Sequence, residues 1–224
     1  MIAEIAHLSV MRPGGLKLTE RALRYCSFQP GARIADVGCG TGATVQFLRN
    51  RYLLEAVGVD IETADFEGGV SERFVQADAA ALPFESESLD AVIAECSLSV
   101  FRQRAQVLGE FGTVLKRGGR LILTDVFVEN AQAASSADRM ELPFCMAGLM
   151  TQVDIERMLE DLGFSIDILE DHSAVLKDFI IRYILEGNGG RSSQDFAVTQ
   201  ATLCALKKVR PHYLLMIATK GDRP

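Results

Sequence analysis

Short apolar runs divide the first part of the chain into strands and a helix. Residues 33–37 and 55–60 are two such runs, and neither alternates apolar with polar positions. A strand buried on both faces of a parallel sheet has this composition. Between the two runs, Val45, Leu48 and Tyr52 recur at helical spacing. The pattern therefore predicts a strand, a turn, a helix and a second strand in that order.

The rest of the chain continues this alternation. It predicts further strands at about residues 72–76, 89–94, 121–124, 164–169 and 213–219, and helices at about residues 18–27, 102–116, 151–162, 174–186 and 192–209. We expect Gly118 and Gly119 to end the helix at 102–116, and Thr151 to cap the helix that follows it. Residues 127–145 have no clear period and predict an irregular segment. The order of elements indicates a single α/β domain.

Three glycines stand at alternate positions between the first strand and its helix. They are Gly38, Gly40 and Gly42. Glycine permits a positive φ and lets the backbone approach a ligand closely. The helix N-terminus adds unpaired N–H groups and a partial positive charge. The loop is therefore a candidate site for an anionic or polar ligand, and the alternative is a glycine-rich turn without one.

An acidic residue ends the second strand at the position where a nucleoside site needs one. Asp60 lies 22 positions after Gly38. Open α/β sheets that bind a nucleoside place a carboxylate about 20 residues after the glycine loop, where it accepts from the ribose hydroxyls. A carboxylate suits two hydroxyls because it offers two acceptor oxygens. A ribose-containing cofactor is the hypothesis, and an exposed Asp at a strand end is the alternative.

Charge and hydropathy narrow the possible partners. The 224 residues include 23 basic and 30 acidic side chains, giving a net charge of −7 without a dense basic run. This balance disfavours nucleic acid as a partner and favours a neutral or cationic small substrate. No apolar run is long enough to span a bilayer, and residues 1–10 do not resemble a signal peptide. We expect a soluble cytoplasmic protein without a membrane partner.

The cysteines do not indicate a disulfide framework or a metal site. There are five, an odd number, and none forms a C-x-x-C pair. This spacing argues against structural disulfides and against a structural zinc site. We expect reduced thiols and no bound metal.

Five ordered motifs resemble those of the class I S-adenosylmethionine-dependent methyltransferases over about residues 30–126. They are D-V-G-C-G-T-G at 36–42, G-V-D at 58–60, A-D-A-A-A-L-P-F at 77–84, S-L-D-A-V-I at 88–93 and L-K-R-G-G-R-L-I-L-T-D at 115–125. The order and spacing of all five carry the resemblance. One departure is the segment after Asp60, where Gly68 and Gly69 disfavour the helix that the family usually has.

The resemblance implies a single methyltransferase domain over residues 1–224. The expected fold is a Rossmann-like sheet of seven strands with helices on both faces and an antiparallel last strand. Residues 1–29 would be an N-terminal arm and helix that cover the cofactor and substrate, and the alternative is an arm that only packs on the surface. Residues 171–211 would be a helical insertion between strands six and seven, forming either a lid or the contact of a homodimer.

The resemblance also implies the cofactor S-adenosyl-L-methionine and a set of residues that bind it. These residues are Asp36, Gly38, Cys39, Gly40, Gly42, Asp60, Ile61, Asp78, Ala79 and Glu95. Asp78 would accept from the adenine amine, although an Asp that caps a turn is the alternative. Because ligands in open α/β sheets lie beyond the carboxyl ends of the strands, Glu95, Cys96 and Ser97 should border the reacting methyl group, and Asp125 should face the same crevice.

Two cysteines suggest a possible acceptor. Cys96 and Cys145 are placed similarly to the metalloid-binding cysteines of arsenite methyltransferases, where soft thiolates hold a soft atom. A third cysteine of that kind is missing, since Cys39 lies in the glycine loop. The alternative is that both are small buried apolar residues. Among the histidines, His172 is the candidate for a catalytic base, and no catalytic triad is expected.

Four functions remain open. The first is methyl transfer from S-adenosylmethionine to a small molecule by in-line attack. The second is the same transfer to a thiophilic or metalloid acceptor. The third is a module that binds S-adenosylmethionine without catalysis. The fourth is a nicotinamide-dependent oxidoreductase, because Ala43 would complete a G-x-G-x-x-A motif.

Overall fold

The computed structural model describes residues 10, 12–62, 73–137, 140, 142, 146, 148–185 and 200–221. The strands are β1 (Arg33–Val37), β2 (Glu55–Asp60), β3 (Phe74–Gln76), β4 (Leu89–Glu95), β5 (Leu115–Val128), β6 (Met150–Thr151), β7 (Phe164–Asp171) and β8 (His212–Lys220). The helices are α1 (Gly15–Cys26), α2 (Ala43–Tyr52), α3 (Arg104–Val114), α4 (Ala131–Ala137), α5 (Gln152–Asp161), α6 (Ser173–Leu185) and α7 (Gln200–Val209), with a 3₁₀ turn, η2, at Leu98–Val100.

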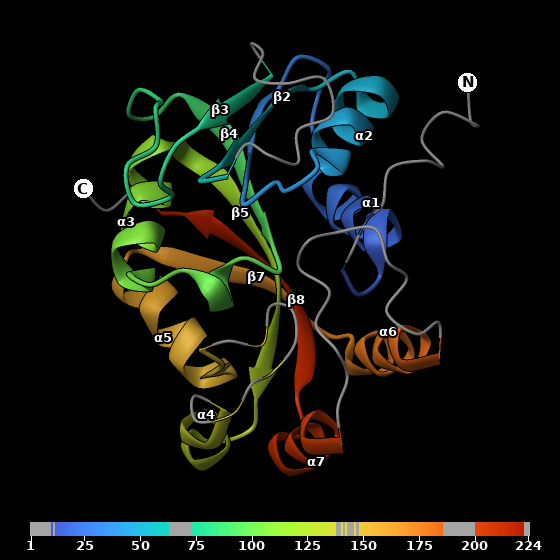
Figure 1. Ribbon diagram of the computed structural model, residues 1–224. Coiled ribbons are helices and arrows are strands. Elements are labelled where there is room, and N and C mark those ends of the chain that lie inside the picture. Colours follow the sequence, from blue (N-terminus) through green and yellow to red (C-terminus); the bar gives the residue numbers. More distant parts are fainter. Residues whose placement is uncertain are drawn as a thin grey trace.

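One mixed sheet forms the centre of the molecule (Figure 1). Its strand order is β3-β2-β1-β4-β5-β8-β7, and the short β6 pairs with β5 outside this path. β1 to β5 run parallel, whereas β8 lies antiparallel between β5 and β7. The predicted Rossmann-like sheet and its antiparallel last strand are confirmed, and β6 is an additional short strand that was not predicted.

Helices cover both faces of this sheet. Leu18 of α1, Leu48 of α2 and Leu176 of α6 belong to one hydrophobic cluster. Phe111 of α3 and Leu159 of α5 belong to a second cluster on the opposite face. Figure 1 shows α1, α2 and α6 on one side of the sheet, with α3 and α5 on the other. The predicted layers are therefore confirmed.

The glycine pair Gly118–Gly119 does not end a helix as predicted. α3 ends at Val114, and the glycines lie inside β5. There the register shifts, because Leu89 pairs with Leu115 while Ala91 pairs with Arg120. The same dipeptide pattern suits a helix end and a strand irregularity, and the pairing with β4 decides between them.

Two helices begin where the sequence did not indicate them. α1 starts at Gly15, three residues before the predicted Leu18, because Gly14 adopts a left-handed conformation with φ of 77°. α4 forms within the segment predicted to be irregular, where the Asn130 side chain accepts from the N–H of Ala133 at 3.0 Å. Such an N-terminal cap compensates for weak apolar periodicity. The Thr151 cap of α5 is confirmed, since its hydroxyl accepts from the N–H of Asp154.

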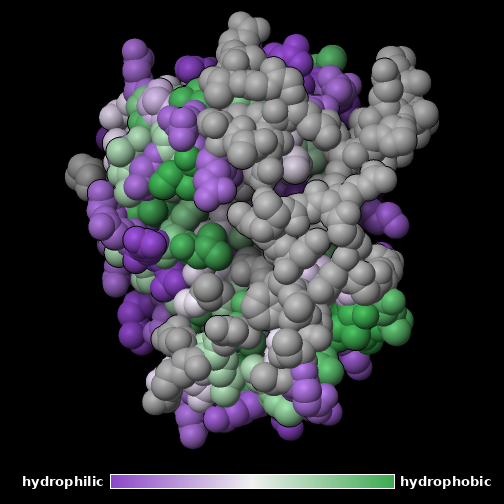
Figure 2. Space-filling model, viewed as in Figure 1, coloured by the Kyte–Doolittle hydropathy of each residue, from purple (hydrophilic) through white to green (hydrophobic). Residues whose placement is uncertain are grey.

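Helices α6 and α7 are inserted between β7 and β8, as predicted. α6 packs beside β8, whereas α7 packs beside α4. Ile181, Ile184 and Leu185 of α6 are 42%, 36% and 78% exposed, and Figure 2 shows the apolar side chains gathered over this helix. Whether the insertion serves as a lid or as a dimer contact stays a prediction.

Some predictions fall outside the described residues. They concern most of the N-terminal arm, the crossover at 63–72, the start of the helix at 192–209, and Cys145. Within the described part of the chain, none of the helices has the length and apolar character that crossing a bilayer requires.

Candidate functional site

The glycine loop after β1 meets both conditions that favour glycine. Gly38, Gly40 and Gly42 all have positive φ, at 76°, 51° and 78°. A Cβ on Gly38 would lie 2.6 Å from that of Ser97, and one on Gly42 would overlap the ring of Phe74. A Cβ on Gly40 would meet no atom within 4 Å. Two positions are therefore crowded by the protein, while the backbone of Gly40 faces open space that a ligand could fill.

Asp60 ties this loop to the end of β2. Its Oδ2 accepts from the N–H of Gly40 at 2.8 Å, and its Oδ1 accepts from the N–H of Glu62 at 3.1 Å. A carboxylate oxygen has two lone pairs, so each oxygen retains acceptor capacity for a ribose hydroxyl. Ile61 follows directly and is 63% exposed. The first two predicted elements of a nucleoside site are thus in contact.

Asp36 lies in β1 just before the loop, and Cys39 is part of the loop. Burial raises the pKa of Asp36 to about 8, with a further upward effect from Glu95 and an opposing one from Arg12. Burial, followed by the charge of Asp36, also raises the pKa of the Cys39 thiol well above its ordinary range. Cys39 is therefore a protonated, unreactive thiol, and Asp36 is an acid whose charge depends on its surroundings.

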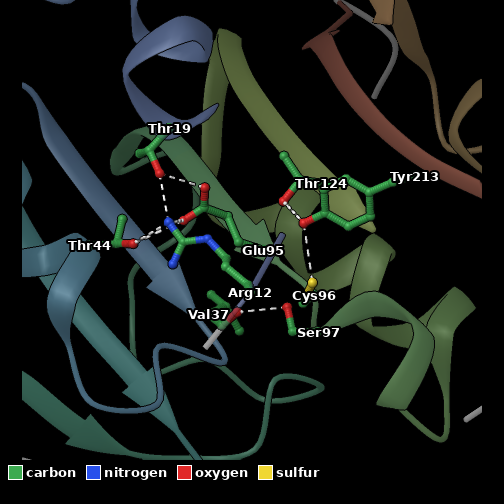
Figure 3. A network of polar contacts seen from close by, with 9 residues as sticks. All are labelled: Arg12, Thr19, Val37, Thr44, Glu95, Cys96, Ser97, Thr124 and Tyr213. Carbon is green, nitrogen blue, oxygen red and sulfur yellow. Dashed lines mark hydrogen bonds and ion pairs between the residues drawn. The ribbon is translucent and has the colours of Figure 1, made fainter. Parts of the chain in front are cut away.

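Arg12 reaches the carboxyl end of β4 and pairs there with Glu95 (Figure 3). Its Nη2 lies 2.6 Å from Glu95 Oε2, and both side chains are buried. The same nitrogen donates to Thr19 of α1 at 2.6 Å and to Thr44 of α2 at 3.0 Å. The two hydroxyls in turn donate to Glu95, at 2.8 and 2.9 Å. These contacts hold three segments on the end of β4, namely the residues before α1, the helix α1 and the helix α2.

Electrostatics keeps this buried pair charged. Although burial alone would lower the pKa of Arg12, the charge of Glu95 raises it above its ordinary value. The Arg12 Nε is buried and finds no hydrogen-bond partner among the described residues. Residues 1–29 were predicted to form an arm and a helix, but no pattern indicated the roles of Arg12, Thr19 and Thr44. The role predicted for Glu95 in cofactor binding stays a prediction, because its oxygens already serve this network.

Asp78 and Ala79 follow β3 in a turn. The Asp78 side chain is exposed, and its Oδ1 accepts from the N–H of Ala80 at 2.9 Å. Its carbonyl accepts from the N–H of Ala81 at 2.9 Å. The turn-capping alternative is therefore observed, while the contact with adenine stays a prediction. Ala79 is buried in the core.

Cys96 and Ser97 lie directly after β4, as expected. Cys96 has a φ of 56°, uncommon for a residue with a side chain. Its Sγ is 3.2 Å from the hydroxyl of Tyr213, which donates to Thr124 at 3.1 Å. Ser97 donates to the carbonyl of Val37 at 3.0 Å. Cys145 lies outside the described residues, so its pairing with Cys96 stays a prediction.

Asp125 does not face the crevice as expected. It is only 1% exposed, and burial raises its pKa to about 6. Its Oδ2 accepts from the N–H of Ser99 at 2.9 Å, and its Oδ1 accepts from the N–H of Val126 at 2.7 Å. The carboxylate therefore fixes η2 against β5. Asp125 also lies inside β5, which continues to Val128, and not at the end of the strand as predicted.

A cavity of about 800 Å³ lies between the start of α1 and one face of α6. Arg12 lines it, so the cavity adjoins the network at the end of β4. His172 lines it too, and its Nε2 is 2.9 Å from Glu170 Oε2. Arg21, which also lines the cavity, lies 2.6 Å from the same Glu170. The candidate base thus borders a space large enough for a small molecule.

Known proteins are similar to this chain in sequence and in fold. Residues 35–123 match the family model described as a methyltransferase domain. The O-methyltransferase resE of Aspergillus sclerotiorum is 26% identical over 218 residues, which cover 89% of this chain and 79% of that protein. The arsenite methyltransferase of Halobacterium salinarum is 27% identical over 201 residues, which cover 83% of this chain and 49% of that protein. The chain spans about half the length of that protein and of two further relatives.

The crystal structure of the cyclase SpnF has the same fold. It superposes with a TM-score of 0.72 at 22% identity, and the match covers 96% of this chain and 85% of that chain.

Proposed function

We propose that this chain transfers the methyl group of S-adenosylmethionine to a small-molecule acceptor. The match of residues 35–123 to a methyltransferase domain and the similarity to an O-methyltransferase support this proposal. The contact between the glycine loop and Asp60 carries this proposal. It joins backbone facing open space to a carboxylate with spare acceptor capacity. That combination suits an adenosyl group.

The residues around the loop fit this cofactor in charge as well as in shape. Gly42 precedes α2 and provides no side-chain cap, so N–H groups of the first turn stay available for an acceptor atom. Asp60 adds a carboxylate beside the loop, whereas Asp36, with its pKa raised to about 8, holds its proton at neutral pH and Glu95 is paired with Arg12. A sulfonium cation is favoured near the carboxylate of Asp60. When bound, S-adenosylmethionine supplies an activated methyl group.

The work left to this chain is to orient the acceptor, exclude water and remove a proton. His172 fits the last role for a hydroxyl acceptor. If Nε2 donates to Glu170, Nδ1 becomes the proton acceptor, and no partner for it is found among the described residues. The name of the fungal relative, an O-methyltransferase, supports an oxygen nucleophile. We therefore assign in-line methyl transfer to oxygen with His172 as base.

A thiophilic acceptor is the second candidate function. The similarity to an arsenite methyltransferase and the placement of Cys96 after β4 favour it. It requires that Cys96 leave its contact with Tyr213 and bind the acceptor as a thiolate. If Cys96→Ser methylates arsenite as fast as the parent protein, or if the parent protein does not methylate it, this candidate is excluded.

Two measurements test the main proposal. Calorimetry should show binding of S-adenosylhomocysteine and none of NAD, because the acidic strand end and the loop are assigned to the adenosyl group of a methyl donor and not to a dinucleotide. A labelled-methyl screen across small phenols, alcohols, amines, thiols and arsenite should then show transfer to a hydroxyl compound. Binding without any transfer would point to a module that only holds the cofactor. Preference for NAD would contradict the proposal altogether.

A further inference from the structure

The cavity beside α6 has two walls of different origin. One wall is a single face of α6 together with the residue before it, since His172, Val175, Phe179 and Arg182 recur at helical spacing. The other wall is the start of α1 and the residues before it, including Lys17. A small molecule between these walls would touch both the segment bound to β4 and the inserted helix.

The charges along these walls do not cancel. Arg12, Lys17, Arg21 and Arg182 line the cavity, and no Asp or Glu is among the described residues that do so. Glu95 neutralises Arg12, and a carboxylate behind the wall neutralises Arg21. Lys17 has no acidic partner in the described part of the chain. In the same part of the chain, Arg182 donates only to a backbone carbonyl of its own helix, at 3.5 Å. Among the described residues, two cationic charges are therefore left for a ligand.

The remaining lining is mostly apolar. Leu16 and Leu18 contribute from α1, and Val175, Phe179 and Tyr183 contribute from α6. These side chains offer an apolar surface to a molecule that lies between the two helices.

We propose, resting on the function proposed above, that this cavity binds the methyl acceptor and that the acceptor is an organic anion with an apolar body. Its carboxylate, sulfonate or phosphate pairs with Lys17 and Arg182, and its apolar part lies between α1 and α6. The net charge of −7 favours a neutral or cationic substrate instead. The charges that line the cavity affect a bound ligand more than charges elsewhere on the protein, because interactions between exposed charges are screened beyond about 10 Å.

Paired fluorescent probes test the charge preference without any methyl transfer. Anilinonaphthalene sulfonate and N-phenylnaphthylamine share an apolar body and differ in the sulfonate. We expect the anion to bind the parent protein more tightly. The double variant Lys17→Met with Arg182→Met should weaken anion binding about fivefold or more and leave the neutral probe unchanged. Lys207→Met, an exposed change in α7, is the matched control and should alter neither.

A second comparison connects the cavity to the reaction. Hydroxybenzoate and hydroxybenzamide offer the same hydroxyl with and without a carboxylate. The parent protein should methylate the acid faster, and the double variant should lose that preference through KM rather than kcat. Equal affinity for the two probes, or anion binding unaffected by the double variant, would overturn the assignment of an anionic acceptor. Absence of S-adenosylhomocysteine binding would instead overturn the proposed function, so the two failures are distinguishable.

Discussion

The backbone N–H of Gly40 donates a hydrogen bond of 2.8 Å to Asp60 Oδ2, which joins the loop after β1 to the end of β2. One carboxylate therefore does two things in this fold. It holds the glycine loop in shape, and it keeps lone pairs for a ligand. This contact leads us to expect that the loop after β1 and the end of β2 bind a ligand together.

Replacing Asp60 should weaken cofactor binding through both effects. We expect Asp60→Ala to raise the Kd for S-adenosylhomocysteine by about tenfold or more, since a hydrogen bond to a charged group contributes about 1.5–3 kcal/mol. Calorimetry measures the change. Asp90→Asn is the control, because Asp90 pairs with Lys116 at the opposite end of β4 and should leave the Kd unchanged. An Asp60→Ala protein with the parent affinity would refute the proposed adenosyl site.

Breaking the pair of Arg12 and Glu95 should destabilise the protein strongly. Arg12→Leu leaves a buried carboxylate without its cation, which typically costs about 3–5 kcal/mol. Adding Glu95→Leu should recover much of that loss, because it removes the unpaired charge. Urea unfolding of the parent, both single variants and the double variant gives the coupling. Arg51→Leu removes an exposed pair with Glu20 and should cost less than about 1 kcal/mol.

The protonation of Asp36 should make stability depend on pH. Its pKa is about 8 in the folded chain against an ordinary value of 3.8. Between these values the native state holds a proton that the unfolded state has released, so its contribution to stability falls as pH rises from about 4 to 8. Asp36→Asn cannot titrate and should escape this fall.

Unfolding of the parent and Asp36→Asn at pH 5 and pH 8 checks the sign. Between pH 5 and pH 8, the free energy of unfolding of the variant should rise relative to that of the parent by at least about 1.4 kcal/mol, which corresponds to one pKa unit. Asp125→Asn should show the same direction over a narrower window, because the pKa of Asp125 is about 6. A constant difference between parent and Asp36→Asn at the two pH values would contradict the buried acid.

His172→Gln should slow methyl transfer to a hydroxyl acceptor without affecting the cofactor. Glutamine can keep the hydrogen bond to Glu170 but cannot take up a proton. We expect kcat to fall about 100-fold, as for loss of a general base. His212→Gln is the comparison, because His212 does not line the cavity among the described residues. Parent-like kcat in His172→Gln would exclude the base.

The sequence predicted those parts of the site that local spacing determines. Glycines at alternate positions and an acid at the end of the next strand are close in the chain, so their geometry follows from strand, loop and helix. The pairing of Arg12 with Glu95 is different. Arg12 lies in a segment without periodicity, and its partner is reached only when the segment folds back over the strand ends. No local pattern contains that contact.

Ambiguous glycines and capped helices explain the errors in the fold. Gly118 and Gly119 have the pattern of a helix end, but the pairing of β5 with β4 uses them inside a strand. Helix α4 has little apolar periodicity, and a side chain of Asn130 supports its first turn. Both outcomes depend on partners distant in sequence or on a single cap. The strand predicted at 121–124 is much longer, at Leu115–Val128. The other periodic helices and strands were predicted within a few residues wherever their ends are described.

The position of β8 between β5 and β7 has a consequence for synthesis on the ribosome. β7 pairs with β8 within the described sheet, so β7 emerges before its link to the rest of the sheet exists. Until residue 220 has left the exit tunnel, β5 presents an open edge to other chains. Completion of the sheet is therefore a late step, and a nascent chain stalled before it would be a substrate for chaperones and proteases.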